Sequence, residues 1–213
     1  MTEPTVAFVS ASDGLKDERL EKGFTLAEFL ISALIFLVMA SSLFSILAEI
    51  QRTAVNQAEA HAVLNNMRIA MQAIERYIRQ AGNDPLGSGL AGITILSSKS
   101  VQIISDLTGS DGGNPDKGDP DGDTDASYEN ITIRFNSVSN TIEIVPDAGP
   151  PQIIASYIAD ILFEYYDETG TPTSVGNAVR KISVTISGSS PLTNLQTHRV
   201  FGAKFSSNIR IET

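Results

Sequence analysis

One uncharged apolar run constrains this chain more than any other feature of its sequence. From Phe29 to Leu47 the residues read FLISALIFLVMASSLFSIL, without Asp, Glu, Lys or Arg. Its length matches the roughly 20 residues that a helix needs to cross a bilayer core about 30 Å thick. Lys16, Arg19 and Lys22 precede the run, whereas only Arg52 follows it closely. The positive-inside bias therefore predicts a single-pass inner-membrane helix, with a cytoplasmic N-terminus and all later residues outside.

An acidic residue stands at the edge of this run, in the segment KGFTLAE (residues 22–28). A carboxylate in lipid is costly, so Glu28 is a candidate functional group that needs a partner. The segment resembles the cleavage region of type IV prepilins. The resemblance implies cleavage after Gly23 by a prepilin peptidase, methylation of the new Phe24 amine, and a role for Glu28 in assembly. A carboxylate one helical turn away, or on a neighbouring subunit, can neutralise that amine in an apolar filament core.

Two plainer interpretations of the segment remain open. A signal anchor would keep Glu28 as an interfacial acid that reaches the lipid headgroups. A secretory signal would be cut at a small-residue site, which the residues Ala-Ser-Ser at 40–42 match in part. We favour the prepilin interpretation because six consecutive positions match, with Ala27 in place of the more usual large aliphatic residue.

The helix is expected to continue beyond the membrane. Residues 49–80 contain neither Gly nor Pro and are rich in Ala, Gln, Glu, Arg and Met, which favour helix. An apolar stripe at three- and four-residue spacing predicts a face that packs on a sheet. The stripe comprises Val63, Met67, Ala70, Ile74, Tyr77 and Ile78. The helix should end near Ala81, because Gly82 can cap it and Pro85 forbids continuation.

The remaining chain is predicted to be rich in β-strands. Short runs of β-branched and aromatic residues occur at 92–96, 101–105, 131–135, 141–145, 161–166, 181–186 and 199–205. Their alternation indicates strands with one buried face, and we expect an antiparallel sheet laid on the helix. This α+β class is also what the type IV pilin fold implies. The predicted segments are a leader (1–23), a transmembrane and assembly helix (24–50), its amphipathic continuation (51–82) and a β-rich domain (83–213).

Within the type IV prepilins, the chain is most similar to PilW-type minor pilins, followed by pseudopilin J of type II secretion. The similarity lies in residues 76–85 (RYIRQAGNDP), 129–135 (ENITIRF) and 162–167 (LFEYYD). Many major pilins have a Pro where Ser45 stands here, and a disulfide-closed C-terminal region that a chain without Cys cannot form. The resemblance therefore implies a minor subunit in the initiation or the tip of filament assembly. Its implied partners are other pilins and an inner-membrane assembly platform.

A loop rich in Asp and Gly, residues 109–129, interrupts the β-rich part. Asp at loop positions 1, 3 and 5 begins the EF-hand calcium pattern, but Thr124 stands where that pattern requires Gly. Two hypotheses follow, a solvated acidic turn or an extracellular Ca²⁺ site. The candidate ligands are Asp119, Asp121, Asp123, Asp125 and Glu129.

The charge balance and the remaining motifs limit the function classes. A net charge of −10, from 25 acidic and 15 basic residues, argues against direct nucleic-acid binding. His61 and His198 stand in no metal-ligand or nucleophile spacing, so we predict no enzyme and no required cofactor. We expect a type IV minor pilin. The alternatives are a type II secretion pseudopilin and a membrane-tethered, Ca²⁺-dependent adhesin or binding domain.

Overall fold

A long helix, α1 (Leu26–Gln80), dominates the N-terminal part of the chain. The computed structural model describes residues 25–109, 118–126, 128–147, 149–193 and 200–211. The predicted helix is confirmed, although its expected first residue, Phe24, lies outside the described residues. The chain divides into two compact units, residues 1–50 and residues 51–213.

The helix ends where the sequence predicts. Gly82 has a φ of 75°, a left-handed conformation that favours glycine, and its N–H donates to the carbonyl of Ile104 at 2.9 Å. The N–H of Asn83 turns back to the carbonyl of Gln80 at 3.1 Å. The end of the helix is thereby tied to a strand of the sheet that follows.

Two antiparallel sheets make up the rest of the second unit. The first has the order β1-β2-β3-β4-β5 and the second the order β6-β7-β8. The strands are β1 (Ile93–Ser97), β2 (Ser100–Ile104), β3 (Asn130–Asn136), β4 (Thr141–Pro146), β5 (Gln152–Ala155), β6 (Ile158–Tyr166), β7 (Lys181–Thr193) and β8 (Val200–Arg210). A short 3-10 turn, η1 (Gly176–Ala178), lies between β6 and β7.

The expectation of one sheet is wrong, although each of the seven predicted runs overlaps a strand. The chain leaves the first sheet at Ser156 and Tyr157, between β5 and β6, and Tyr157 has a φ of 62°. That left-handed turn directs β6 into a separate sheet, because it breaks the extended path of the backbone. Strand β5 was not predicted, since its four residues are too few to show an alternation.

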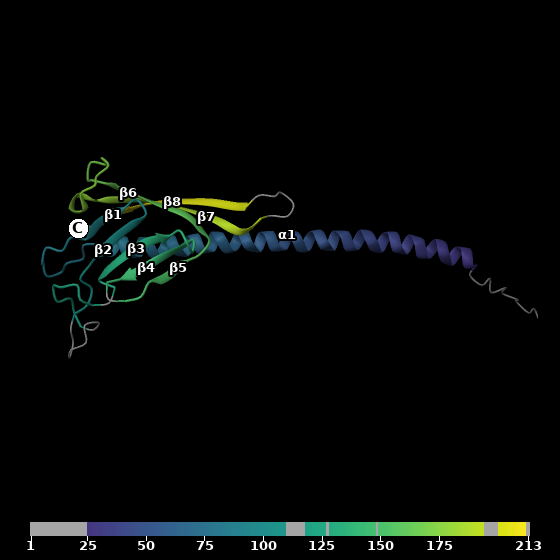
Figure 1. Ribbon diagram of the computed structural model, residues 1–213, viewed down its shortest axis with the longest axis horizontal. Helices are drawn as coiled ribbons and strands as arrows, with labels where there is room; N and C mark the ends of the chain where they lie inside the picture. Colours follow the sequence, from purple (N-terminus) through teal and green to yellow (C-terminus); the bar gives the residue numbers. More distant parts are fainter. Residues whose placement is uncertain (1–24, 110–117, 127, 148, 194–199, 212–213) are drawn as a thin grey trace, which may run out of the picture. The chain divides into compact units, whose positions relative to one another are not determined.

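One apolar core joins α1 to both sheets, which Figure 1 draws beside the C-terminal half of the helix. Register pairs such as Ile133 with Ile144 and Ile161 with Ile186 place buried residues side by side within each sheet. The buried helix residues are Val63, Met67, Ala70, Met71, Ile74 and Ile78. The predicted stripe is therefore confirmed in most positions. Tyr77 is only partly buried, and Met71 is buried although it was not predicted.

Candidate functional site

The N-terminal half of α1 presents an apolar surface around its whole circumference. Phe29, Phe36 and Phe44 are each at least 65% exposed, and neighbouring Leu, Ile and Val side chains are similarly open. This part of α1 is long and apolar enough to span a membrane by length and composition, a property that N-terminal signal sequences share. An exposed apolar surface of this extent marks a site of interaction with a membrane or with other proteins.

The serine hydroxyls in this apolar stretch donate hydrogen bonds to carbonyl oxygens of the same helix. Ser41 donates to the carbonyl of Val38 at 2.9 Å, and Ser42 donates to the carbonyl of Met39 at 2.8 Å. Ser45 donates to the carbonyl of Ser41 at 3.0 Å. Because these bonds stay within one helix, the hydroxyls would keep a hydrogen-bond acceptor in an apolar medium.

Thr25 and Glu28 form a reciprocal cap at the start of the helix. The Thr25 N–H donates to the Glu28 carboxylate at 2.9 Å, and so does the Thr25 hydroxyl at 2.9 Å. In return the Glu28 N–H donates to the Thr25 hydroxyl oxygen at 3.2 Å. This capping box satisfies backbone donors that the first turn leaves unpaired. The other residues of the predicted cleavage motif, Gly23 and Phe24, lie outside the described residues.

The aspartates of the acidic loop lie on the surface. Asp119, Asp121, Asp123 and Asp125 are all exposed, and successive members bond through Asx turns. Repulsion from Asp123 is the main cause that raises the pKa of Asp125. Among the residues that the structure describes, no group of three or more His, Asp or Glu side chains is arranged to hold a metal. The Ca²⁺ hypothesis thus stays a prediction.

Glu129, the fifth candidate ligand, is buried, and its carboxylate accepts hydrogen bonds from backbone N–H groups. One carboxylate oxygen, Oε1, accepts the N–H groups of Leu107 at 2.7 Å and Thr108 at 2.8 Å. The other, Oε2, accepts the N–H of Ala126 at 3.1 Å. Oε1 therefore binds donors just before the loop and Oε2 binds a donor within it, which fixes the base of the loop to the end of β2.

Sequence reasoning missed a second buried carboxylate next to this loop. Asp106 is completely buried, and its Oδ2 accepts the N–H of Gly122 at 2.9 Å. Its position directly after the strand 101–105 was the available signal, because an acid at the end of a buried strand is uncommon. The acidic loop is thus anchored from beneath by Glu129 and Asp106.

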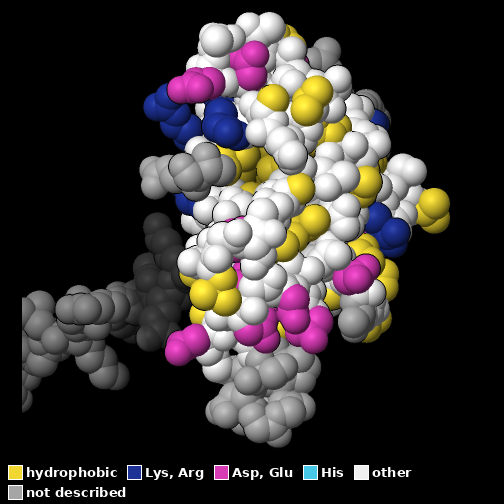
Figure 2. All heavy atoms as spheres, turned by 90° about the vertical axis from the view of Figure 1, so that its left-hand side faces the viewer, with side chains coloured by type: hydrophobic (Ala, Val, Ile, Leu, Met, Phe, Trp, Pro, Cys, Tyr) yellow, Lys and Arg dark blue, Asp and Glu magenta, His cyan; other side chains and the backbone are white. Residues whose placement is uncertain are grey.

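A cationic hollow, which was also not predicted, lies where β7 begins and β8 ends. Lys181 and Arg210 are register partners, and with Arg180 they line a hollow of about 350 Å³. Asp167 borders the hollow, and hydrogen bonds from Thr169 lower the pKa of its carboxyl. On the face drawn in Figure 2, Lys and Arg side chains gather at the upper left, whereas Asp and Glu side chains dominate the lower part.

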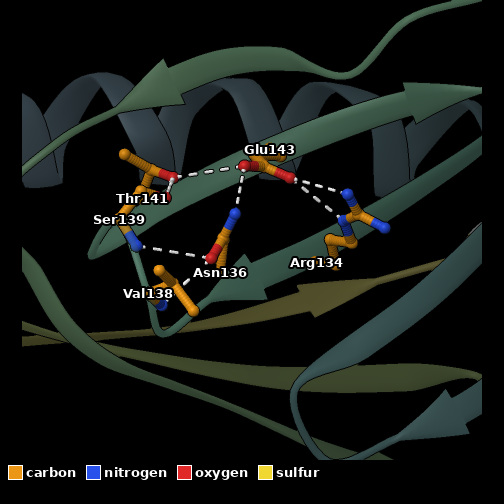
Figure 3. A network of polar contacts seen from close by, with 6 residues as sticks. All are labelled: Arg134, Asn136, Val138, Ser139, Thr141 and Glu143. Atoms are coloured by element: carbon orange, nitrogen blue, oxygen red, sulfur yellow. Dashed lines mark hydrogen bonds and ion pairs between the residues drawn. The ribbon is translucent and has the colours of Figure 1, made fainter.

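A polar network braces the hairpin of β3 and β4 (Figure 3). Glu143 accepts bonds from Arg134 Nε at 3.0 Å and from Asn136 Nδ2 at 2.8 Å. The Asn136 amide bond, followed by the Arg134 guanidinium, lowers the pKa of the Glu143 carboxyl. The side-chain oxygen of Asn136, Oδ1, accepts the N–H groups of the turn residues Val138 and Ser139. These contacts are local to the hairpin and indicate a structural role.

Of the two histidines, only His61 lies in the described part of the chain. His61 is exposed on α1, and His198 lies outside the described residues. No protein-family model matches this chain, and no curated protein matches it either. Its function therefore has to be inferred from its own residues and geometry.

Proposed function

We propose that this chain is a subunit of a type IV filament, a minor pilin that acts in the initiation or the tip of assembly and not as an enzyme. The observation that carries the proposal is the combination of one helix with two environments. Residues 26–50 of α1 are apolar and exposed, whereas the face from Val63 to Ile78 is buried in a β-rich core. An α+β layout with a long apolar N-terminal helix agrees with the type IV pilin fold.

The N-terminal motif supplies the assembly chemistry in this proposal. Prepilin peptidase cuts after Gly23, the Phe24 amine is methylated, and Glu28 pairs with an amine of its own or a neighbouring subunit. The Glu28 carboxylate is held by Thr25 alone in the described residues, at the exposed end of the helix. Exchange of that cap for an ammonium partner would replace two hydrogen bonds from neutral donors with an ion pair in an apolar setting.

The proposed membrane orientation of the chain follows from the positive charges that precede the apolar helix. The N-terminus starts in the cytoplasm, the helix crosses the inner membrane, and the β-rich part faces outward before it enters the filament. The apolar half of α1 packs against the helices of other pilins after extraction from lipid. The inner-membrane assembly platform acts on this helix, and the β-rich surface contacts partner subunits.

The decisive experiment is intact mass measurement and N-terminal sequencing of the protein from membranes with and without prepilin peptidase. We expect a chain that begins at N-methylated Phe24 only when the peptidase is present. Gly23→Val should block the cut, because the residue at the cleavage position is changed. Gly14→Val, a change at another leader glycine, should leave it intact. A chain that stays uncut with active peptidase, or is cut near Ser41, contradicts the proposal.

Filament incorporation tests the role of Glu28 separately. Glu28→Gln removes the charge and should abolish incorporation while the protein still inserts into the membrane and is cut. Glu49→Gln, in the same helix, is the matched control and should assemble. Deletion of the gene then separates the two filament systems. Loss of pilus-dependent motility or DNA uptake supports a pilus, whereas loss of protein export supports a type II secretion pseudopilus.

A further inference from the structure

Asp106 combines complete burial with an unsatisfied oxygen. Its Oδ2 accepts the Gly122 N–H, but its Oδ1 has no hydrogen-bond partner, and it is the one such buried side-chain atom in the described part of the chain. The Asp106 backbone is fixed to Asn83 from both sides, by its N–H at 2.8 Å and by its carbonyl at 2.6 Å. The side chain therefore cannot reach solvent by a small shift of its own backbone.

An orphaned carboxylate oxygen in the interior is costly. A buried polar group without a partner loses its hydration and gains nothing in return, and the penalty is larger for a charged group. Native structures satisfy nearly all such groups, so an unsatisfied one needs a specific explanation, and a bound ion is one of them. The Asp106 Oδ1 thus calls for a donor or a cation that the described part of the chain does not supply.

The carboxylate lies directly against the acidic segment. Gly122, which bonds Asp106, stands between Asp121 and Asp123, and both of these side chains are exposed. A close approach at Gly109 is a second contact in the same region. A Cβ atom on Gly109 would stand 2.3 Å from the carbonyl oxygen of Asp119 and 2.9 Å from Cγ of Asp121. Gly109 therefore packs closely against the backbone of Asp119 and the side chain of Asp121, which brings the chain just after Asp106 against the acidic segment.

We propose that a calcium ion binds here, with Asp106 as its buried anchor. Ligands of this kind, carboxylate and carbonyl oxygens, suit hard divalent cations, and Ca²⁺ accepts irregular sets of six to eight oxygens that include water. Asp121 and Asp123 supply further carboxylates, and the Asp119 carbonyl is a backbone candidate. Glu129 is not a ligand in this site, because both of its oxygens already accept backbone N–H groups.

The site belongs to the weak extracellular class. The described residues hold no ready-made group of three acidic side chains, so backbone oxygens and water must complete the shell. Sites of that kind bind in the range of about 10⁻⁴ to 10⁻³ M, which matches the Ca²⁺ available outside cells. Binding pulls Asp121 and Asp123 toward Asp106 and orders the exposed segment around Gly122. Ca²⁺ binding by itself does not depend on the filament proposal, whereas supply of the ion from outside the cell rests on the proposed outward topology.

The test uses the full chain in detergent micelles, stripped with EDTA, and titrates it with CaCl₂ by calorimetry and thermal unfolding. About 10 mM Ca²⁺ should raise the Tm by about 3 to 5 °C, and NaCl of equal ionic strength should not. Asp106→Asn should abolish the Ca²⁺ shift and the heat of binding. In EDTA this variant should melt at least as high as the wild type, because the uncompensated charge is gone.

A control variant and a substitute variant make the Ca²⁺ titration interpretable even if Asp106→Asn does not fold. Asp147→Asn, at an exposed position, should bind Ca²⁺ like the wild type. If Asp106→Asn fails to fold, Asp121→Asn takes its place and should weaken the affinity about tenfold, as expected for the loss of one carboxylate ligand. No heat and no Tm shift in the wild type at about 10 mM Ca²⁺ would overturn the inference. Unchanged binding in the variant that folds would overturn it as well.

Discussion

Gly188 of β7 lies so close to Met67 of α1 that a Cβ atom on the glycine would stand 2.5 Å from the Met67 sulfur. The same Cβ would be 2.8 Å from Cγ1 of Val63. Both helix residues are essentially buried, with exposed fractions of 0% and 1%. The absence of a side chain at residue 188 therefore lets the second sheet approach the helix at the centre of the core.

We expect Gly188→Ala to lower the free energy of unfolding by about 1 to 3 kcal/mol, because the added methyl overpacks the core. Gly202→Ala is the control. Its Cβ would meet no atom closer than 3.7 Å, so the variant should be as stable as the wild type or slightly more so. Urea unfolding of both proteins checks this, and equal stability of Gly188→Ala and wild type would contradict the close approach.

Met67→Ala should cost about 2 to 5 kcal/mol of unfolding free energy, since it leaves a cavity under both sheets. Ile69→Ala, two residues further along the same helix, should change stability by no more than about 0.5 kcal/mol. The reason is that Ile69 is 45% exposed. Thermal unfolding of the two variants measures the difference. Similar losses in both would show that the helix face is assigned wrongly.

Glu143→Gln should destabilise the β3–β4 hairpin by about 1 to 3 kcal/mol at neutral pH, because the Arg134 guanidinium loses its carboxylate. The folded-state pKa of Glu143 is lowered, so the charge stabilises the fold fully above the ordinary glutamate pKa of about 4.3. That contribution is lost as the pH falls through the lowered folded-state pKa. The stability gap between wild type and variant should therefore shrink in acid.

Unfolding curves from pH 7 down to about pH 3 measure this gap. Glu164→Gln is the control, because Glu164 is exposed on β6. Its gap to wild type should be small at every pH. A constant gap for Glu143→Gln would show that the charge of Glu143 is not what stabilises the hairpin.

Glu129→Gln should lower stability by about 1 to 3 kcal/mol in EDTA, where no metal contributes. A glutamine offers one oxygen and one NH₂, and that NH₂ would face a backbone N–H in place of an acceptor. Asp123→Asn, on the exposed part of the same loop, should have no measurable effect in EDTA. Loss of stability in Asp123→Asn alone would reverse the roles assigned to these two acids.

Local sequence patterns predicted the helix and most of the strands, but not how the strands are divided between two sheets. The helix, its end at Gly82 and the main strands follow from spacing and turn residues that act over a few positions. The division into two sheets did not follow, because it depends on the left-handed turn at Tyr157, a residue type that seldom adopts it. Strand β7 also extends beyond the predicted run 181–186, to Thr193.

The sequence likewise named some residues of the candidate sites and not others. Sequence pattern named the acidic loop and Glu129, yet it treated Glu129 as a metal ligand, whereas the structure gives its oxygens to three backbone N–H groups. Asp106 was not predicted, because the few residues around it in the sequence do not show that its carboxylate is buried without a partner. Burial is a property of contacts between distant segments.

By itself the sequence determined that this chain has a membrane-length apolar helix, an amphipathic continuation and half-buried strands, because hydrophobic periodicity and capping are local. Only the tertiary structure decided which strands pair, that Gly188 meets Met67, and that Lys181 and Arg210 share one hollow. It also decided that Asp106 ends beneath Gly122 with one oxygen unsatisfied. These relationships join residues far apart in the chain, so they depend on how the core packs and not on any single segment.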